Sequence, residues 1–519
     1  MLREAWFSVA ARRVRRLPSP AVANRPDVLV VGGGTAGAVV AGRLVEAGIG
    51  VTVLDAGPDY GPWRAGGWPE ELLDARRPPE LHDWGYAGPG ADGQRLAFDR
   101  ARVIGGCSSH NGCAQSWGWR GDYDRWGSMG CAGWSANEVL PSFHRATERM
   151  RVRRYETEEI QPFQAAFIDA AASAGVSRTD DLDDLDGGAG VAVEPVNAVD
   201  GVRWNTSFAY LDPVRARREL TVIGDALVDR VLFDGTRAVG VGAITTDGRE
   251  EFHADLVVLS GGAYGTPEVL LRSGIGPARE LRALDIDVVA DVPGVGRALQ
   301  DQPAIELAFH AGGELAAALD EFAAVRWLPE EQAIAKLTTP ESDGPFDLHV
   351  YPWVEPDPSS RWRCVLPVAL LTPASRGAVR LRSSDPTVRA EIDHRYLSDD
   401  AGHDLTRMAW GLRWISDLAV GRLAAWLGTA IDPLPELSDD VAKEAWIRSR
   451  HGHYWHPGGT CRMGGEGDPR SVVDQAGRVV GVAGLRVADA SIFPSIPRAT
   501  PALPTVVIGE RMADMLIEE

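Results

Sequence analysis

A glycine-rich turn between a short apolar run and a helical pattern is the feature that most constrains the fold of this chain. The run DVLVV at 27–31 leads directly into GGGTAG at 32–37, and apolar residues then recur with helical spacing. A second apolar run, VTVL at 51–54, ends at Asp55. Strand, tight turn, helix and strand in this order form a βαβ unit. The sequence therefore predicts a protein that begins as an α/β fold.

The same turn carries a dinucleotide-binding pattern. Gly32, Gly34 and Gly37 occupy the three constrained positions of GxGxxG, after a strand and before a helix, which is the context that this motif requires. Glycine lets the backbone approach a pyrophosphate, whose charge faces the N-terminus of the helix. Asp55 is placed to accept hydrogen bonds from an adenosine ribose. A glycine turn without a ligand is the alternative, and the motif alone does not separate FAD from NAD.

Composition narrows the class of protein and of partner. The 519 residues are 45% hydrophobic and 24% charged, as in a soluble globular protein, and no apolar stretch reaches the roughly 18 to 20 residues of a transmembrane helix. A formal charge of -20 argues against a nucleic acid or an anionic membrane as partner. Five cysteines without CxxC spacing fit a reducing compartment, and no signal-peptide run follows the basic segment 1–20. We therefore expect a cytoplasmic protein that binds a small molecule.

Beyond the βαβ unit the composition and the hydrophobic pattern of the sequence change twice. Residues 57–134 are rich in Gly, Pro and Trp and predict a long loop region. Between about 304 and 449, FDLHVY at 346–351 and GAVRLR at 377–382 alternate as amphipathic strands. A strand-turn-helix pattern returns near the C-terminus, with a helix expected over 505–517. One domain is thus assembled from both chain ends, and a β-rich lobe is inserted into it.

A histidine near the C-terminus is a candidate proton acceptor. His456 stands in YWHPGGTCRMG at 454–464, before a turn rich in Pro and Gly. A neutral imidazole can accept an alcohol proton while the carbinol hydride leaves for a flavin. With His451 and His453 it forms HxHxxH, but no carboxylate or cysteine stands at a familiar ligand spacing, so we predict no metal site. A structural role for His456 is the alternative.

Three long stretches resemble the signatures of the glucose-methanol-choline (GMC) oxidoreductases, a family of FAD-dependent alcohol oxidases and dehydrogenases. The first is RVIGGCSSHN at 102–111, continuing to RGDYDRW at 120–126; the second is GAYGTPEVLLRSGIG at 262–276; the third joins the His456 segment to DAS at 489–491. The resemblance implies an α/β fold, α+β overall, in which a Rossmann-like FAD-binding domain carries an inserted β-sheet substrate-binding domain.

The resemblance also implies how the chain is divided. The FAD-binding domain would consist of three segments and the substrate-binding domain of two. In chain order they are 24–160 (FAD-binding), 161–200 (substrate-binding), 201–303 (FAD-binding), 304–449 (substrate-binding) and 450–519 (FAD-binding, with His456).

A set of residues is placed at FAD by the same resemblance. Gly105 and Gly106 would let the main chain lie against the cofactor, and Asp489 would hold its ribityl hydroxyls. A helix beginning near Thr505 would direct its positive end at the flavin pyrimidine. His110 matches the position at which the choline-oxidase branch bonds flavin covalently, and a noncovalent contact is the alternative. The full set is Gly32, Gly34, Gly37, Asp55, Gly105, Gly106, Ser109, His110, Asn111, Val228, Asp489 and Ala490.

The chain departs from the family pattern opposite the base. The family usually has a second His or Asn there, and PSIPRATP at 494–501 aligns Thr500 with that position. A threonine hydroxyl can hydrogen-bond the substrate oxygen but cannot act as a second base. We therefore expect His456 as the base and Thr500 as an auxiliary hydrogen-bonding residue. Arg498 is either a substrate contact or a surface residue.

Together these features predict FAD-dependent oxidation of a secondary alcohol, with O₂ or a quinone-type compound as electron acceptor. The Trp-rich region and the flavin loop look similar to bacterial pyranose and glycoside oxidases, so a sugar or glycoside C3 hydroxyl is the first expectation. A choline or small-alcohol oxidase or dehydrogenase is the alternative, favoured by an acidic residue among aromatic faces. A photo- or decarboxylating lyase and a flavoprotein without turnover are alternatives of other classes.

Overall fold

The centre of one domain is a parallel sheet. The computed structural model describes residues 27–359, 361–434 and 436–519, so the basic segment 1–20 lies outside the described residues. Within these ranges the sheet has five short strands, and all but the half-exposed edge strand are buried or nearly so, as in parallel sheets covered on both faces. In spatial order they are β10 (Leu220–Ile223), β2 (Val51–Leu54), β1 (Val28–Val31), β14 (Leu256–Leu259) and β27 (Leu485–Val487).

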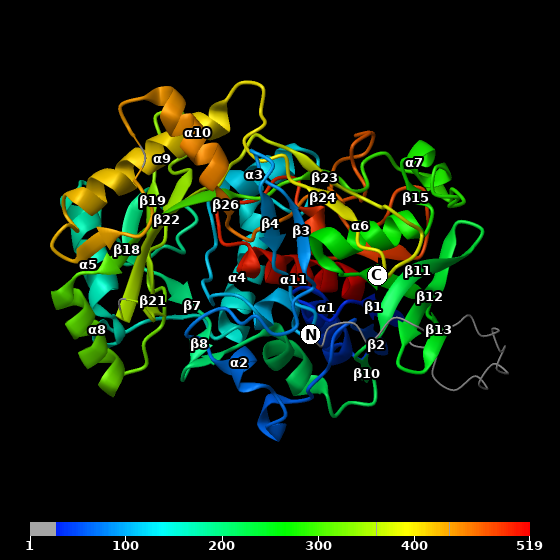
Figure 1. The fold of residues 1–519 in the computed structure, drawn as a ribbon. Coiled ribbons are helices and arrows are strands. Elements are labelled where there is room, and N and C mark those ends of the chain that lie inside the picture. Colours follow the sequence, from blue (N-terminus) through cyan, green and yellow to red (C-terminus); the bar gives the residue numbers. More distant parts are fainter. Residues whose placement is uncertain (1–26, 360, 435) are drawn as a thin grey trace, which may run out of the picture.

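Two helices from opposite ends of the chain pack beside this sheet. α1 (Gly37–Glu46) connects β1 to β2, which confirms the βαβ unit, and it contacts the C-terminal helix α11 (Ala502–Glu518), drawn in blue and red at the centre of Figure 1. Gly509 permits the close approach, because a Cβ there would lie 2.7 Å from the Cβ of Val39. α11 begins at Ala502, earlier than the helix expected from 505. α4 (Ala136–Arg149) packs against α11.

An antiparallel sheet forms the core of the second lobe, at the left in Figure 1. In the described chain its eight strands are β25 (Leu427–Ala430), β18 (Pro303–Ala311), β22 (Arg361–Leu370), β20 (Leu348–Val350), β19 (Ala333–Leu337) and β6 (Gly190–Val193), with β21 (Trp353–Asp357) on β22 and β26 (Gly452–His453) on β18. Its helices are α5 (Pro162–Ser173), α8 (Gly313–Val325), α9 (His403–Val420) and α10 (Asp440–Arg450). Because β26 leads directly into the His456 segment, this sheet helps to position the candidate base.

Of the two strands expected to be amphipathic, 346–351 is buried on both faces, whereas in 377–382 Arg380 is half-buried and Arg382 is exposed. In 346–351 every side chain is buried, with Phe346 and Tyr351 in one apolar cluster and Leu348 and Val350 in another. Alternation arises because Asp347 turns inward to accept the amide and the hydroxyl of Thr339, at 2.8 and 2.5 Å. In the sequence pattern, a buried polar residue that is hydrogen-bonded thus looks the same as a polar residue that faces solvent.

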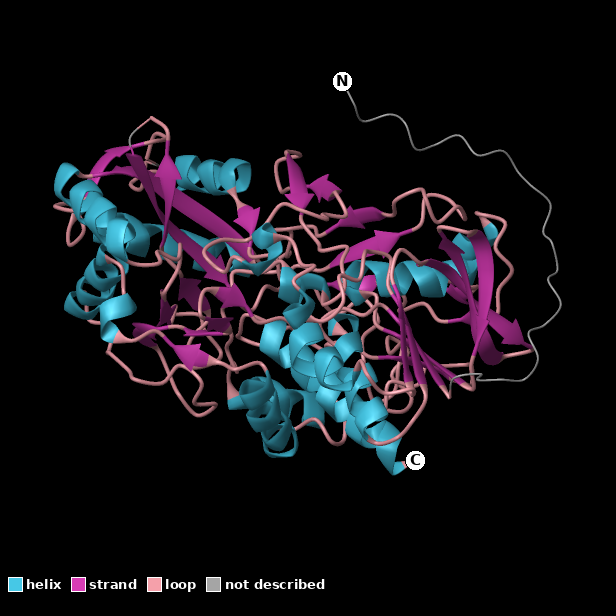
Figure 2. Ribbon diagram, turned by 90° about the horizontal axis from the view of Figure 1, so that it is seen from below, coloured by secondary structure: helices cyan, strands magenta, loops and turns pink. Residues whose placement is uncertain are grey.

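The region 57–134 is not one long loop. It contains α2 (Glu70–Leu73), the hairpin of β3 (Tyr86–Pro89) and β4 (Arg95–Phe98), and α3 (Arg120–Ser128). In Figure 2 the strands gather in two groups at the two sides of the molecule, with loops between them. Within the described ranges, no helix is both long and apolar enough to cross a membrane.

The remaining elements are β5 (Arg153–Arg154), β7 (Pro195–Val196), β8 (Ala198–Val199), β9 (Val202–Arg203), β11 (Leu227–Asp234), β12 (Arg237–Thr245), β13 (Gly248–His253), α6 (Gly262–Arg272), β15 (Ile275–Gly276), α7 (Ala278–Arg282), β16 (Ala290–Asp291), β17 (Arg297–Leu299), β23 (Gly377–Arg380) and β24 (Glu391–Asp393).

Candidate active site

A cavity of about 1420 Å³ begins at the carboxyl ends of the parallel strands and reaches residues of the antiparallel lobe. Val31, Leu54 and Ser260 mark the ends of β1, β2 and β14 on its wall. Open α/β sheets bind ligands at this edge. Of the residues predicted from the sequence, the wall contains Gly32, Gly34, Asp55, Gly106, His110, Asn111, Val228, His456, Asp489, Ala490 and Thr500.

The glycine turn presents backbone to the cavity. Gly32 has a φ of 94°, and a Cβ there would lie 2.5 Å from the carbonyl oxygen of Ser260. Asp55 accepts the amides of Gly33 and Gly57, at 2.9 and 2.8 Å, which fixes the turn to the end of β2. Burial raises the pKa of Asp55 to about 6, although both amides oppose the shift. The turn therefore offers N–H groups rather than side chains to a ligand.

Three residues predicted to contact the cofactor lie outside the cavity lining. A Cβ on Gly37 would lie 1.9 Å from the carbonyl oxygen of Gly32, so this glycine holds α1 against the turn. Gly105 adopts a φ of 84°, which turns the following loop. The buried hydroxyl of Ser109 donates to the carbonyl oxygen of Ile104 at 3.0 Å. Against the expectation from the sequence, that hydroxyl closes the loop on itself.

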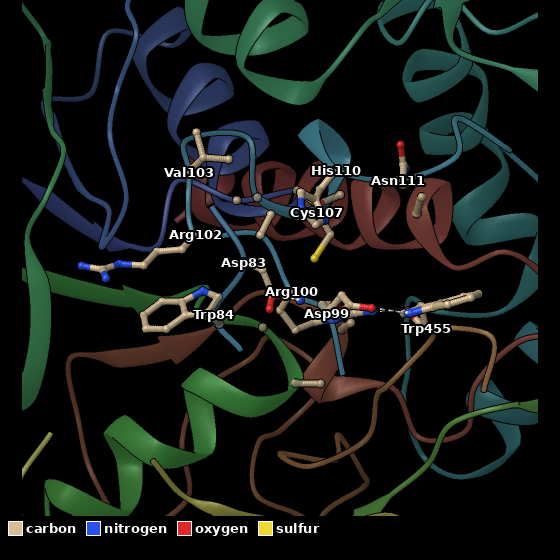
Figure 3. A pocket seen from close by; sticks show the side chains of 18 of the residues that line it. Asp83, Trp84, Asp99, Arg100, Arg102, Val103, Cys107, His110, Asn111 and Trp455 are labelled. Atoms are coloured by element: carbon tan, nitrogen blue, oxygen red, sulfur yellow. Dashed lines mark hydrogen bonds between the residues drawn. The ribbon is translucent and has the colours of Figure 1, made fainter. Parts of the chain in front are cut away.

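The loop after Gly106 brings His110 and Asn111 to the cavity, where Figure 3 shows both side chains. His110 is 8% exposed, and its buried Nε2 has no hydrogen-bond partner among the described residues. Burial lowers the pKa of His110, so the ring is neutral. Asn111 uses its Oδ1 to accept the amide of Cys113 at 3.2 Å, which leaves its NH₂ group as the donor available to a ligand.

His456 is held in one orientation. Its amide donates to Asp301 Oδ1 at 2.8 Å, and its Nδ1 lies 2.6 Å from Gln302 Oε1. The Gln302 NH₂ group donates to the carbonyl oxygens of Leu371 and Pro497, so Oε1 must accept from the imidazole. Nδ1 therefore carries the hydrogen and Nε2 the lone pair. Burial lowers the pKa of His456 well below its usual range, and the nearby Arg100 lowers it further.

Thr500 lies on the cavity wall, whereas Arg498 lies outside the cavity lining and supports the wall. Thr500 Oγ1 lies 3.1 Å from Ser116 Oγ and 3.3 Å from the carbonyl oxygen of Ala114, so its hydroxyl is already engaged. Arg498 is fully buried, with one end of its guanidinium on Asp122 and the other on Asp343. It is neither a surface residue nor in the cavity lining. It fixes the turn that carries Thr500.

Asp489 connects the second and third signature stretches. Its carboxylate accepts the amide of Gly262 at 2.8 Å, the hydroxyl of Thr266 at 2.5 Å and the amide of Ser491 at 2.8 Å. Gly262 is the first and Thr266 the fifth residue of α6, so Asp489 joins the beginning of that helix to the segment after β27. Its carboxylate is at the cavity, but three of its acceptor sites hold the protein together.

The three histidines of the HxHxxH pattern do not converge. His451 Nε2 accepts the amide of Ala91 at 2.8 Å, and His453 Nε2 donates to the carbonyl oxygen of Ala97 at 2.7 Å. His453 Nδ1 accepts the amide of Trp455 at 3.1 Å. Their ring nitrogens thus bind backbone, and within the described ranges no group of three or more His, Cys, Asp or Glu side chains is arranged to hold a metal ion.

The comparison with known families agrees with this geometry. The two models described as GMC oxidoreductase match residues 26–304 and 373–509. The chain belongs to the GMC oxidoreductase family. This GMC oxidoreductase is 34% identical to the choline oxidase of Arthrobacter globiformis over 94% of each chain, and 33% identical to the 5-(hydroxymethyl)furfural oxidase of Methylovorus sp. over 95% of this chain and 99% of the relative. Pyridoxine 4-oxidase from Mesorbium loti is a structural neighbour, with a TM-score of 0.84, 26% identity, and coverage of 95% of this chain and 99% of its own.

Membership implies FAD and oxidation of CH–OH donors. The residues present fit that cofactor, since a Cβ on Gly106 would lie 2.7 Å from the Cα of Gly34 and only glycine leaves room between the two loops. The unpartnered Nε2 of His110 adds a polar atom that lacks a bond within the protein. His110, Asn111 and the amides of the glycine turn are the residues that would hold the group.

Two residues of the site were not predicted from the sequence. Arg100 lies on the cavity wall, where Figure 3 shows it between Asp83 and Asp99, and its charge contributes to lowering the pKa of both His456 and His110. Gln302 fixes the imidazole from a position 154 residues away. Neither stands in a recognisable motif, so no signal in the sequence marks them.

Proposed function

We propose that this GMC oxidoreductase oxidises the hydroxyl group of a small, uncharged alcohol to a carbonyl, with His456 as the base. The observation that carries the proposal is the imidazole on the cavity wall with its Nδ1 hydrogen committed to Gln302. Its Nε2 has no hydrogen-bond partner among the described residues, so it is the atom available to a substrate hydroxyl. Choline, 5-(hydroxymethyl)furfural and pyridoxine, after which three relatives are named, are all small alcohols, and of the three only choline carries a quaternary ammonium charge.

The residues divide the work of the reaction. His456 Nε2 accepts the hydroxyl proton, and Gln302 keeps the ring in the tautomer that can do so. The Arg100 guanidinium favours the negative charge that develops on the substrate oxygen as this proton leaves. Thr500 lines the same cavity as His456, and its hydroxyl is hydrogen-bonded to Ser116. Bound FAD would supply the acceptor for the hydride from the carbinol carbon.

The substrate prediction changes from a sugar to a smaller alcohol. None of the three relatives quoted above is named for a sugar or a glycoside. An acidic residue among aromatic faces, the feature expected for a choline-type site, is present as Glu331 near Tyr351 and Tyr454. Burial and the adjacent Glu194 raise the pKa of Glu331 well above its usual range. Burial therefore disfavours the negative charge that an ammonium group would need at this position. O₂ or a quinone remains the proposed acceptor.

Anaerobic bleaching of the flavin tests the proposed substrate class. Purified holoenzyme is mixed in the absence of O₂ with benzyl alcohol, with choline or with a methyl glucoside, and the flavin absorbance is followed. We expect rapid bleaching by the uncharged primary alcohol. Bleaching by the glucoside alone would restore the sugar prediction, and bleaching by choline alone would favour a cationic substrate.

His110 provides a second test, of how the cofactor is held. If its Nε2 is bonded to flavin, acid precipitation of the wild-type protein leaves a yellow pellet. His110→Ala is expected to release all the colour to the supernatant and to take up hydride more slowly, because attachment raises the flavin potential. A colourless wild-type pellet would leave His110 as a noncovalent neighbour.

A further inference from the structure

Trp455 is the only exposed tryptophan among those that the structure describes. Its exposed fraction is 43%, whereas the other described tryptophans are buried or half-buried. It precedes His456 directly and lines the same cavity. A single exposed apolar side chain is common on protein surfaces, so the exposure of Trp455 is informative only together with its position on the cavity wall. An indole that is held in place at this position can serve as a binding surface.

Three hydrogen bonds hold Trp455. Its indole Nε1 donates to Asp99 Oδ2 at 3.1 Å, the contact drawn as a dashed line in Figure 3. Arg100 Nη2 donates to the Trp455 carbonyl oxygen at 2.8 Å, and the Trp455 amide donates to His453 Nδ1 at 3.1 Å. Both polar ends of the residue are thus bonded, and the indole packs edge-on against the His453 ring at 5.1 Å.

The backbone of Trp455 is in a region that bulky residues rarely adopt. Its φ is 59°, in the left-handed region, next to the candidate base. Strained residues persist where the surrounding structure determines them, and they cluster at functional sites. Trp455 therefore combines a rarely adopted backbone conformation with an exposed side chain on the cavity wall.

We propose that the indole of Trp455 is the surface on which a planar aromatic ring of the substrate stacks, so that the carbinol beside the ring reaches His456. Aromatic rings recognise one another by offset stacking or edge-to-face contact. A quaternary ammonium group could also bind an indole face. The charges of Arg100, bonded to the Trp455 carbonyl oxygen, and of Asp99, bonded to the indole, oppose each other here, so no net charge favours an ammonium group over a neutral ring. This inference rests on the proposed function, since it names the substrate class of that site.

The test separates ring binding from turnover. Binding of benzamide, of its saturated counterpart cyclohexanecarboxamide and of tetramethylammonium to the holoenzyme is measured from the flavin difference spectrum. We expect benzamide to bind about ten-fold more tightly than the saturated amide. Trp455→Ala should abolish this preference, Trp455→Phe should keep most of it, and Trp446→Ala, on α10 outside the cavity lining, should leave it unchanged.

The inference is overturned if benzamide does not bind the wild-type protein, if Trp455→Ala binds it as the wild type does, or if tetramethylammonium binds most tightly. Anaerobic reduction by benzyl alcohol is measured in parallel, and there Trp455→Ala should raise the KM with a smaller change in the limiting rate. Trp455-dependent benzamide binding without any alcohol oxidation would reject the proposed function alone. Oxidation that is indifferent to Trp455 would reject this inference alone.

Discussion

His456→Ala is expected to lower the limiting rate of anaerobic flavin reduction by about 10³-fold, because a positioned general base contributes on the order of 10² to 10⁴ in rate. The flavin content should stay that of the wild type, since His456 lies outside the glycine turn and the His110 loop, which are the segments proposed to hold the cofactor. Stopped-flow absorbance with the best alcohol of the substrate panel measures the rate.

A matched substitution separates the base from a general effect of losing an imidazole. His403 is exposed at the beginning of α9, and His403→Ala should reduce flavin at the wild-type rate. Added imidazole should restore part of the activity of His456→Ala, because the cavity would then admit a free base. Reduction by His456→Ala within ten-fold of the wild type would reject the assignment.

The βαβ unit was predictable from the sequence because it depends on short-range patterns. The βαβ unit needs only three neighbouring segments, and Gly37 is required by a contact within that unit, its approach to the Gly32 carbonyl oxygen. Gly32 and Gly34 instead lie against distant segments, at Ser260 and Gly106. The resemblance added the long-range part, since both chain ends meet at α1 and α11. The residues expected at the cofactor mostly lie on one cavity.

What the sequence does not determine has a common physical origin, which is that a polar residue in the sequence does not reveal its partner. The alternation in 346–351 predicts a solvent-facing Asp347, whose hydrogen bonds to Thr339 form only in the fold. The hydroxyl of Ser109, predicted to contact the cofactor, donates to a local carbonyl oxygen. Both carboxylates that pair with Arg498 are distant in sequence, so the sequence alone does not decide its role.

Arg498 is also the residue whose loss should destabilise the fold most. Arg498→Ala would leave Asp122, which is 3% exposed, as a buried carboxylate without its charge partner. Removing one member of a buried ion pair costs about 3 to 5 kcal/mol. We expect the free energy of unfolding to fall by this amount, measured as a shift of the denaturation midpoint in urea. The backbone amide of Arg498, which donates to Asp122 at 2.8 Å, offsets only part of the loss.

Arg125 supplies the control, because it also pairs with Asp343 but on the surface, where the two side chains are 43% and 53% exposed. An exposed pair contributes only about 0 to 1 kcal/mol, so Arg125→Ala should change the midpoint little. Combining Arg498→Met with Asp122→Leu should recover stability, since no charge is then left buried. Equal effects of Arg498→Ala and Arg125→Ala would mean that burial does not decide the strength of this pair. If Arg498→Ala loses stability as expected and also reduces flavin more slowly, the buried arginine is linked in addition to the placement of Thr500, two residues later.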